Sequence, residues 1–171
     1  RKRRELDLED KAEHDALTGL MNRQTASVLI PAALERTVQH ENAGAFAIID
    51  LDDFKLVNDH YGHLSGDSVL AGVAQHLRRA FGENDLICRW GGDEFVVYCE
   101  RTTRDDMAAR MHVLCDGPWK TTLEDQREIS LSVSIGIAMA PQDGTTFKTV
   151  YERADRALYQ AKSKGKAHFC F

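Results

Sequence analysis

The sequence predicts an α/β (α+β) fold, a ferredoxin-like central antiparallel sheet flanked by helices. Its 171 residues are 43% hydrophobic, enough to bury one core. Stretches with helical spacing alternate with stretches typical of strands, in the order β-α-α-β-β-α-β-α-β. The sequence contains no internal repeat or low-complexity segment. We therefore expect one domain over residues 15–171, preceded by a short lead-in.

Local patterns predict each element in turn. Apolar residues at helical spacing predict helices, and continuous or alternating apolar runs predict strands. Pro31 lies inside the first helical stretch and should bend that helix or delay its start. The run 45–49 is apolar on both faces and indicates a central, buried strand. The expected elements are a helix over 25–39, a strand over 45–51, a short helix near 55–60, a helix over 70–81, strands over 85–89 and 95–98, a helix over 107–115, a strand from 129 toward 138, a helix over 147–161 and a last strand near 167–171.

The lead-in, residues 1–14, is almost entirely polar and charged, with a thin apolar stripe. Such a segment buries little surface by itself, so we expect the end of a helix that continues upstream or pairs with a copy of itself. Its basic run, Arg1–Arg4, is more consistent with a solvated helix face than with the alternative, a nucleic-acid or membrane patch.

Composition argues against several classes of protein. The formal charge of −5 disfavours a protein that coats nucleic acid. No apolar run approaches the roughly 18 residues that span a bilayer, and no secretory signal opens the chain. We expect a cytoplasmic domain, with any membrane anchor in an upstream segment. The four cysteines lack C-x-x-C spacing and indicate reduced, mostly core thiols rather than a zinc site: Cys88, Cys99, Cys115 and Cys170.

Two carboxylates, Asp93 and Glu94, follow a double glycine between two strand-like segments. Gly91 and Gly92 predict a hairpin turn, because glycine enters φ > 0 without steric cost. A turn without side chains also lets a bulky ligand approach the backbone. A bound divalent cation would explain acids this close together. The alternative is a solvated hairpin tip with two exposed acids.

A second acidic cluster ends the central strand. Strand alternation places Asp50 and Asp52 on one face and Leu51 on the other. The end of a buried strand is a common place for ligands, and acids from here and from the hairpin can share Mg²⁺ with the phosphates of a nucleotide. The structural alternative for Asp52 and Asp53 is capping of the following helix, which we favour for Asp52.

These motifs resemble the GGDEF family of diguanylate cyclases. Gly91–Phe95 spells the family signature, and the resemblance covers nearly the whole chain from Asp15 onward. It implies a palm-type version of the predicted fold and the condensation of two GTP into cyclic di-GMP, in the output domain of a larger signalling protein. The further stretches that resemble family motifs are Asp15–Arg23, Asp50–Lys55 with Asn58-Asp59 and Tyr61–Asp67, Ser132–Ala138 and Ala154–Lys162.

The resemblance also implies a role for each candidate site residue. Asp93 and Glu94 would be catalytic. Mg²⁺, or alternatively Mn²⁺, would be held by Asp50, the Leu51 carbonyl, Asp93 and Glu94. The residues implied in substrate binding are Asn58 and Asp67 for guanine; Asp53, Phe54, Lys55, Lys162 and Lys166 for the phosphates; and His63, Gly91 and Gly92.

The chemistry of these residue types suits those roles. A carboxylate at Asp67 can accept from the N1–H and 2-amino group of guanine; capping of the 68–81 helix is its structural alternative. The structural alternative to phosphate binding for Lys162 and Lys166 is stabilisation of the negative end of a helix dipole by their positive charges. Two positions depart from the family pattern: Lys166 stands where arginine is usual, and Ala167 where asparagine is common.

Because one domain binds one GTP, the resemblance implies a homodimer of domains, controlled by an upstream sensory domain. There are two rival interpretations. One is a nucleotide-binding regulatory module without turnover, and the other is a mononucleotide cyclase or polymerase-like palm enzyme.

Many relatives also carry an R-x-x-D inhibitory site for the product. Here Gly82 occupies the arginine position, so we expect weak feedback, with Asp85 kept as part of the turn into the hairpin.

Overall fold

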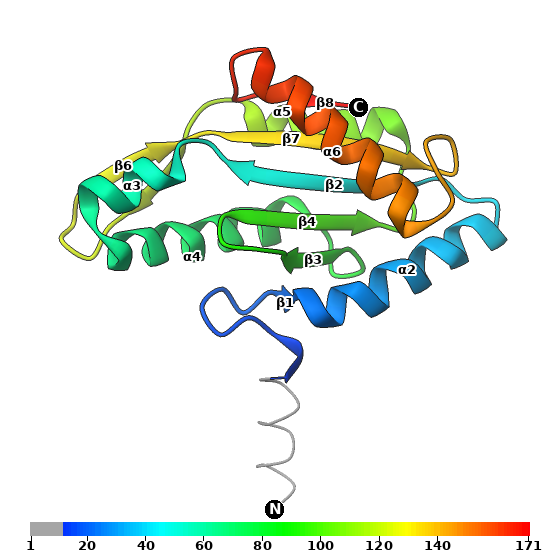
Figure 1. The fold of residues 1–171 in the computed structure, drawn as a ribbon, viewed down its shortest axis with the longest axis horizontal. Coiled ribbons are helices and arrows are strands. Elements are labelled where there is room, and N and C mark those ends of the chain that lie inside the picture. The colour runs from blue at the N-terminus through cyan, green and yellow to red at the C-terminus, as the bar shows by residue number, and fades with distance from the viewer. Residues whose placement is uncertain (1–11) are drawn as a thin grey trace, which may run out of the picture.

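The computed structural model describes residues 12–171, so the expected lead-in helix falls almost wholly outside the described residues (Figure 1). The elements in chain order are β1 (Met21–Asn22), α2 (Arg23–Gln39), β2 (Gly44–Leu51), α3 (Phe54–Tyr61), α4 (His63–Ala80), β3 (Leu86–Arg89), β4 (Glu94–Cys99), α5 (Arg104–Cys115), β5 (Trp119–Thr122), β6 (Glu128–Leu131), β7 (Val133–Ala140), α6 (Phe147–Ser163) and β8 (Phe169–Cys170).

The main sheet has the strand order β1-β3-β4-β2-β7-β8 (Figure 1). Its central pairs, β3 with β4, β4 with β2 and β2 with β7, are antiparallel. The edge strands β1 and β8 run parallel to β3 and β7. A separate two-stranded sheet consists of β5 and β6. The predicted α/β (α+β) fold, a central antiparallel sheet flanked by helices, is confirmed.

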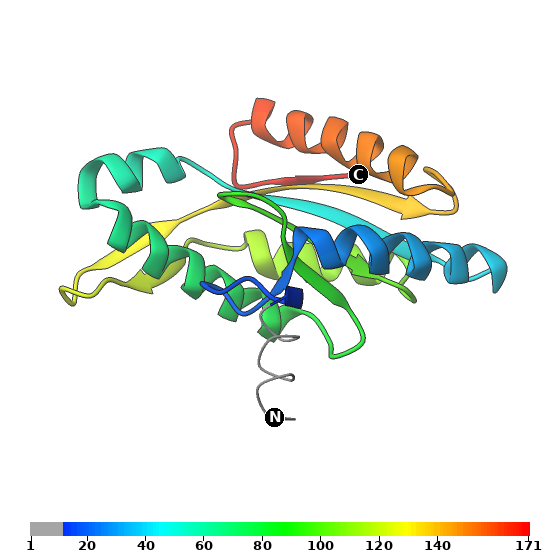
Figure 2. The same cartoon turned by 60° about the horizontal axis from the view of Figure 1, so that its bottom comes forward.

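Side chains of β2 alternate between two cores on opposite faces of the sheet. Phe46 and Ile48 pack with apolar residues of α2 and α6. Ala47 and Ile49 pack with apolar residues of α4 and α5. Figure 2 shows α6 and α4 on opposite sides of the sheet. The strand is therefore central and buried on both faces, as its continuous apolar run predicts.

The start of the first long helix differs from the prediction. Asn22 caps α2 by accepting the Thr25 backbone N–H at 2.9 Å, so the helix begins at Arg23. Pro31 lies within the helix and does not delay its start. The delayed start was wrong because the cap, rather than the proline, decides where this helix begins; the other alternative, a bend at Pro31, stays a prediction.

The region after α5 also differs from the prediction. The strand expected from 129 toward 138 is divided at Ser132 into β6 and β7, which belong to different sheets. The partner of β6 is β5, a short strand that was not predicted. Polar residues alternate in β5 with the buried Trp119 and Thr121, so its four residues contain little apolar signal.

The cysteines are free, as expected, and Cys88, Cys99 and Cys170 are buried. Burial raises the pKa of the Cys88 thiol to about 12 and that of Cys115 to about 11, so both stay protonated near neutral pH. Within residues 12–171, no helix has both the length and the apolar character needed to cross a membrane.

Helix α6 lies against β7 at Gly136, which has no room for a side chain. A Cβ there would lie 2.0 Å from the Ala154 carbonyl oxygen and 2.3 Å from the Leu158 nitrogen, both in the α6 backbone. We predict that Gly136→Ala forces the helix from the sheet and lowers the free energy of unfolding by about 3 kcal/mol or more. Urea denaturation measures the loss.

Gly91→Ala is the matched control, because a Cβ at Gly91 meets no atom within 4 Å and the backbone there is not left-handed. Its unfolding free energy should stay within about 0.5 kcal/mol of the parent. Equal midpoints for the two variants would contradict the close contact between α6 and β7.

Candidate functional site

Side chains from separate parts of the chain meet at one end of the main sheet. The end of β2, the β3–β4 turn and the end of α6 lie together there (Figure 1). Antiparallel pairing produces this arrangement: β2 ends where β4 and β7 begin. The two acidic clusters of the sequence therefore converge, as predicted.

Asp50 and Glu94 are direct partners in the register of β2 and β4. The Leu51 N–H donates to the Asp93 carbonyl at 3.2 Å, which fixes the hairpin turn beside the end of β2. The turn is closed by the Trp90 and Gly91 N–H groups, which donate to the Glu94 carbonyl at 2.9 and 3.1 Å. Asp50, Asp93 and Glu94 thus belong to one site.

The site acids are half-buried and repel one another. Burial raises the pKa of Asp50, with Asp93 adding to the rise, while the Lys162 ammonium that pairs with Asp50 opposes it. Burial also raises the pKa of Glu94, opposed by the Tyr151 hydroxyl, which donates to Glu94 at 3.3 Å. A positive charge placed among these carboxylates would favour their ionised form.

The donor set fits a hard divalent cation that a substrate helps to hold. Within residues 12–171, no three His, Cys, Asp or Glu side chains are grouped closely enough to hold an ion by themselves. Mg²⁺ is commonly bound by only one or two carboxylates together with substrate phosphates. Asp50 and Glu94, paired across the strands, meet that requirement.

The double glycine lies in the predicted hairpin turn, but its backbone conformation differs from the prediction. Neither Gly91 nor Gly92 has a positive φ, so the expectation of left-handed backbone was wrong. A Cβ on either residue would meet no atom within 4 Å. The glycines therefore leave open space beside Asp93, which agrees with the expected close approach of a ligand.

Asp52 does not cap a helix. Its buried carboxylate accepts from the Ser132 and Ser134 hydroxyls and from the Ala167 N–H. The N-cap of α3 is Asp53, which has left-handed backbone and makes no side-chain capping bond. The capping interpretation was wrong for both residues, because their side chains turn toward partners distant in the sequence.

The residues expected to bind guanine lie on two helices joined at Gly62. Asn58 is on α3 and Asp67 is on α4, where it is exposed. The helices approach closely, since a Cβ on Gly66 would lie 1.9 Å from the Asn58 Oδ1. α4 begins at His63, so Asp67 is inside the helix and the capping alternative for it was wrong.

The expected phosphate-binding residues lie on both sides of the end of β2. Phe54 and Lys55 begin α3, and Lys55 is exposed. Lys162 is in the last turn of α6, where complementation of the helix dipole remains an alternative. Lys166 is beyond the helix and pairs with Asp53 at 2.6 Å, which raises the pKa of the lysine.

Sequence reasoning assigned no site role to Tyr151, Ser132 or Ser134. Tyr151 was counted only as part of the apolar stripe of a helix, although it donates to Glu94. Ser132 and Ser134 continue an alternation of serine with apolar residues that begins at Ser130, so the sequence places their side chains on one face of the strand that it predicts. That spacing was the available signal.

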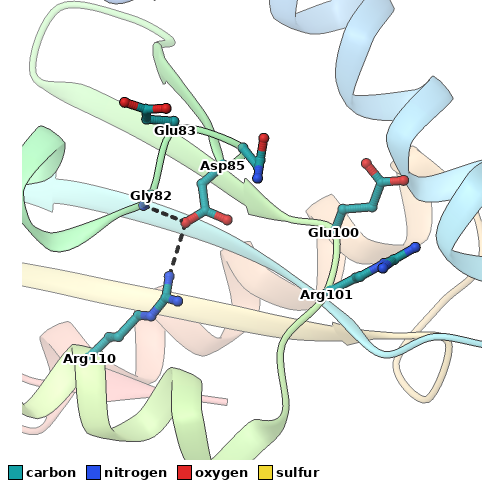
Figure 3. A pocket seen from close by; sticks show the side chains of 7 residues that line it. Gly82, Glu83, Asp85, Glu100, Arg101 and Arg110 are labelled. Atoms are coloured by element: carbon teal, nitrogen blue, oxygen red, sulfur yellow. Dashed lines mark hydrogen bonds and ion pairs between the residues drawn. The ribbon is translucent and has the colours of Figure 1, made fainter.

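A second pocket, away from these acids, lies beside the turn that begins at Gly82 (Figure 3). Asp85 accepts the Gly82 N–H at 2.8 Å and pairs with Arg110 at 3.0 Å. The structural role predicted for Asp85, within the turn into the hairpin, is confirmed. Glu83, Glu100 and Arg101 also line the pocket, so carboxylates and guanidinium groups lie in it together.

Comparison with known proteins identifies the family. The sequence model described as "Diguanylate cyclase, GGDEF domain" matches residues 12–168. The chain belongs to the GGDEF family. This confirms the resemblance based on the sequence motifs.

The chain is similar to several curated proteins. It is 38% identical over 160 residues to the bifunctional diguanylate cyclase/cyclic di-GMP phosphodiesterase MucR of Pseudomonas aeruginosa, covering 94% of this chain and 23% of that protein. It is 35% identical over 166 residues to diguanylate cyclase DgcM of Escherichia coli, covering 96% of this chain and 40% of that protein. The chain thus spans well under half the length of these relatives.

Solved structures of GGDEF domains are similar in fold. The GGDEF domain of PA1120 (TpbB or YfiN) from Pseudomonas aeruginosa has a TM-score of 0.79 and 34% identity, covering 90% of this chain and 91% of that chain. The coiled coil and GGDEF domain of DgcB from Caulobacter crescentus, in complex with c-di-GMP, has a TM-score of 0.84 and 27% identity, covering 99% and 90%.

Proposed function

We propose that this domain is a diguanylate cyclase, which condenses two GTP into cyclic di-GMP and two pyrophosphates. One observation carries the proposal: in a GGDEF-family chain, Asp50 and Glu94 pair across β2 and β4 while Lys162 reaches Asp50 from α6. Carboxylates for a metal and ammonium groups for phosphates are the parts that this reaction needs.

The acids would hold the metal. Asp50, the Leu51 carbonyl, Asp93 and Glu94 would ligate Mg²⁺, with Mn²⁺ as the alternative. Catalysis would use two such ions, which when bound would lower the pKa of the attacking hydroxyl and stabilise charge on the leaving oxygens. Each 3′-hydroxyl attacks the α-phosphorus of the other nucleotide, in line with the departing pyrophosphate.

The other site residues would bind and orient GTP. Asn58 and Asp67 recognise guanine, and adenine is rejected because it lacks the N1–H and 2-amino donors that the Asp67 carboxylate accepts from guanine. Lys162, Lys166 and Lys55 contact the phosphates, together with backbone N–H groups near Asp53 and Phe54. Gly91 and Gly92 leave space for the nucleotide, and His63 lies where α4 begins, near the guanine side.

Two domains would face each other across their hairpins, because each supplies one GTP site. The upstream segment and a sensory domain before it would control that geometry, so the isolated domain would be a weak enzyme. We place the domain in the cytoplasm, with any membrane anchor upstream. Nucleic acid is not proposed as a partner.

Product analysis separates the proposal from its rivals. A regulatory module would bind nucleotide without turnover, and a mononucleotide cyclase would release a single cyclised nucleotide. Incubation with GTP and Mg²⁺, followed by mass spectrometry, should detect cyclic di-GMP. Absence of that product at high domain concentration would overturn the proposal.

We predict that Asp93→Asn lowers turnover by about a thousandfold or more, because removal of a charged metal ligand costs several kcal/mol of transition-state stabilisation. The thermal midpoint should change little, since the residue is in the hairpin turn and outside the apolar core. The matched control, Asp116→Asn, changes an exposed aspartate at the end of α5 and should leave turnover unaltered. Wild-type synthesis by Asp93→Asn would contradict the assignment.

We predict that activity rises more steeply than linearly with domain concentration. Fusion of a parallel coiled coil upstream of Arg1, in a suitable register, should raise specific activity by raising the effective concentration of a second domain. The control is the same coiled coil with serine at its core positions. Specific activity that is independent of domain concentration and unchanged by the fusion would exclude a requirement for two domains.

We predict weak product inhibition, because no guanidinium occupies position 82, Glu83 adds a negative charge beside it, and Arg110 of the adjoining pocket is already paired with Asp85. Gly82→Arg should lower the inhibitory concentration of cyclic di-GMP by about tenfold. The site admits the change, since a Cβ at Gly82 lies 3.6 Å from the nearest atom, the Asp85 Oδ2.

Asn84→Arg is the matched control for this variant, because it adds the same charge to the same pocket in the wrong register. Binding is measured by titrating cyclic di-GMP into the purified domain. Tight binding to the unmodified domain that is lost in Asp85→Ala would refute the prediction.

A further inference from the structure

Asp52 joins three segments that are far apart in the sequence. The residue is only 6% exposed, and its carboxylate accepts from the Ser132 hydroxyl at 2.5 Å, the Ser134 hydroxyl at 2.7 Å and the Ala167 N–H at 3.0 Å. The Asp52 N–H also donates to the Ser132 carbonyl at 3.0 Å. The end of β2, the start of β7 and the α6–β8 loop are therefore held together by one side chain.

The loop that Asp52 holds has an unfavourable backbone. Gly165, Lys166 and Ala167 follow one another with φ values of 109°, 64° and 51°. Lysine and alanine rarely adopt left-handed backbone, and such residues persist only where the surroundings impose them. A charge-assisted bond from the Ala167 N–H to a buried carboxylate is a restraint of that kind.

A second bond connects the same two segments in a different environment. Lys166 pairs with Asp53, and these side chains are 44% and 56% exposed. Water screens an ion pair of this exposure, so a phosphate can compete for the lysine. The Asp52 bonds are buried and would stay in place while Lys166 exchanges one anion for another.

We propose that Asp52 is a positioning residue for the triphosphate of the substrate, an inference that rests on the proposed function. Its carboxylate fixes the α6–β8 loop against the end of β2 and so directs Lys166 toward the Asp53–Phe54 turn. Asp52 touches no reacting atom in this scheme. It acts through the loop, and its loss should weaken binding of the β- and γ-phosphates while recognition of guanine is unchanged.

The experiment compares 3′-deoxy-GTP, which lacks the attacking hydroxyl, with 3′-deoxy-GMP, both titrated with Mg²⁺ and followed by NMR. Asp52→Ala should raise the Kd of the triphosphate about tenfold and leave that of the monophosphate within about twofold. Asp52→Asn should raise the triphosphate Kd by about threefold, because its amide oxygen still accepts from Ala167 but without charge.

Asp143→Ala is the matched control. Asp143 follows the other end of β7, accepts the Met139 N–H at 2.7 Å and lies away from the proposed phosphate site. Its loss should alter neither dissociation constant. If Asp52→Ala does not fold, Asp52→Asn carries the test, and an unchanged triphosphate Kd in that folded variant overturns the proposal.

A double-mutant cycle tests the route of action. If Asp52 acts through Lys166, Asp52→Ala combined with Lys166→Met should bind the triphosphate no more weakly than Lys166→Met alone. Additive losses, or equal losses for both ligands, would mean that Asp52 does not position that lysine. Failure of the unmodified domain to bind 3′-deoxy-GTP would instead refute the proposed function.

Discussion

The pairing of β2 with both its neighbours determines where the charged groups of the site lie. Its register places Asp50 opposite Glu94 in β4 and opposite Ser134 in β7. A slip of one residue would exchange the two faces of the strand and bury Asp50 in an apolar core. Phe46 on one face and Ile49 on the other are completely buried, so packing opposes that slip. Apolar burial, rather than attraction between charges, therefore brings mutually repelling acids together.

Helix α6 supplies the groups that offset this repulsion. Lys162 pairs with Asp50, and the Tyr151 hydroxyl donates to Glu94. Both contacts require the helix to lie close to the sheet, which the missing side chain of Gly136 permits. A residue chosen by steric fit in the middle of β7 thus controls the electrostatic balance at the end of β2.

Local patterns predicted the elements that carry the site, because β2 is a continuous apolar run, a double glycine marks the hairpin and α6 has strong apolar spacing. The same reasoning failed for β5, which is short and half polar, and for the break at Ser132, which depends on a change of partner strand. It also failed for Asp52. The position of that residue before a helix indicated a cap, but its partners lie 80 or more residues further along the chain. No local pattern contains such contacts.

The residues that break local rules are concentrated at the site. Asp53, Lys166 and Ala167 have left-handed backbone, and Asp50 and Glu94 are half-buried acids side by side. Each feature is unfavourable by itself and persists only because the surrounding structure imposes it. Burial of β2 on both faces provides the stability that offsets these unfavourable features, and the end of the same strand carries the acids. Substitutions in the core between β2, β7 and α6 would consequently alter the geometry of the site before they unfold the domain.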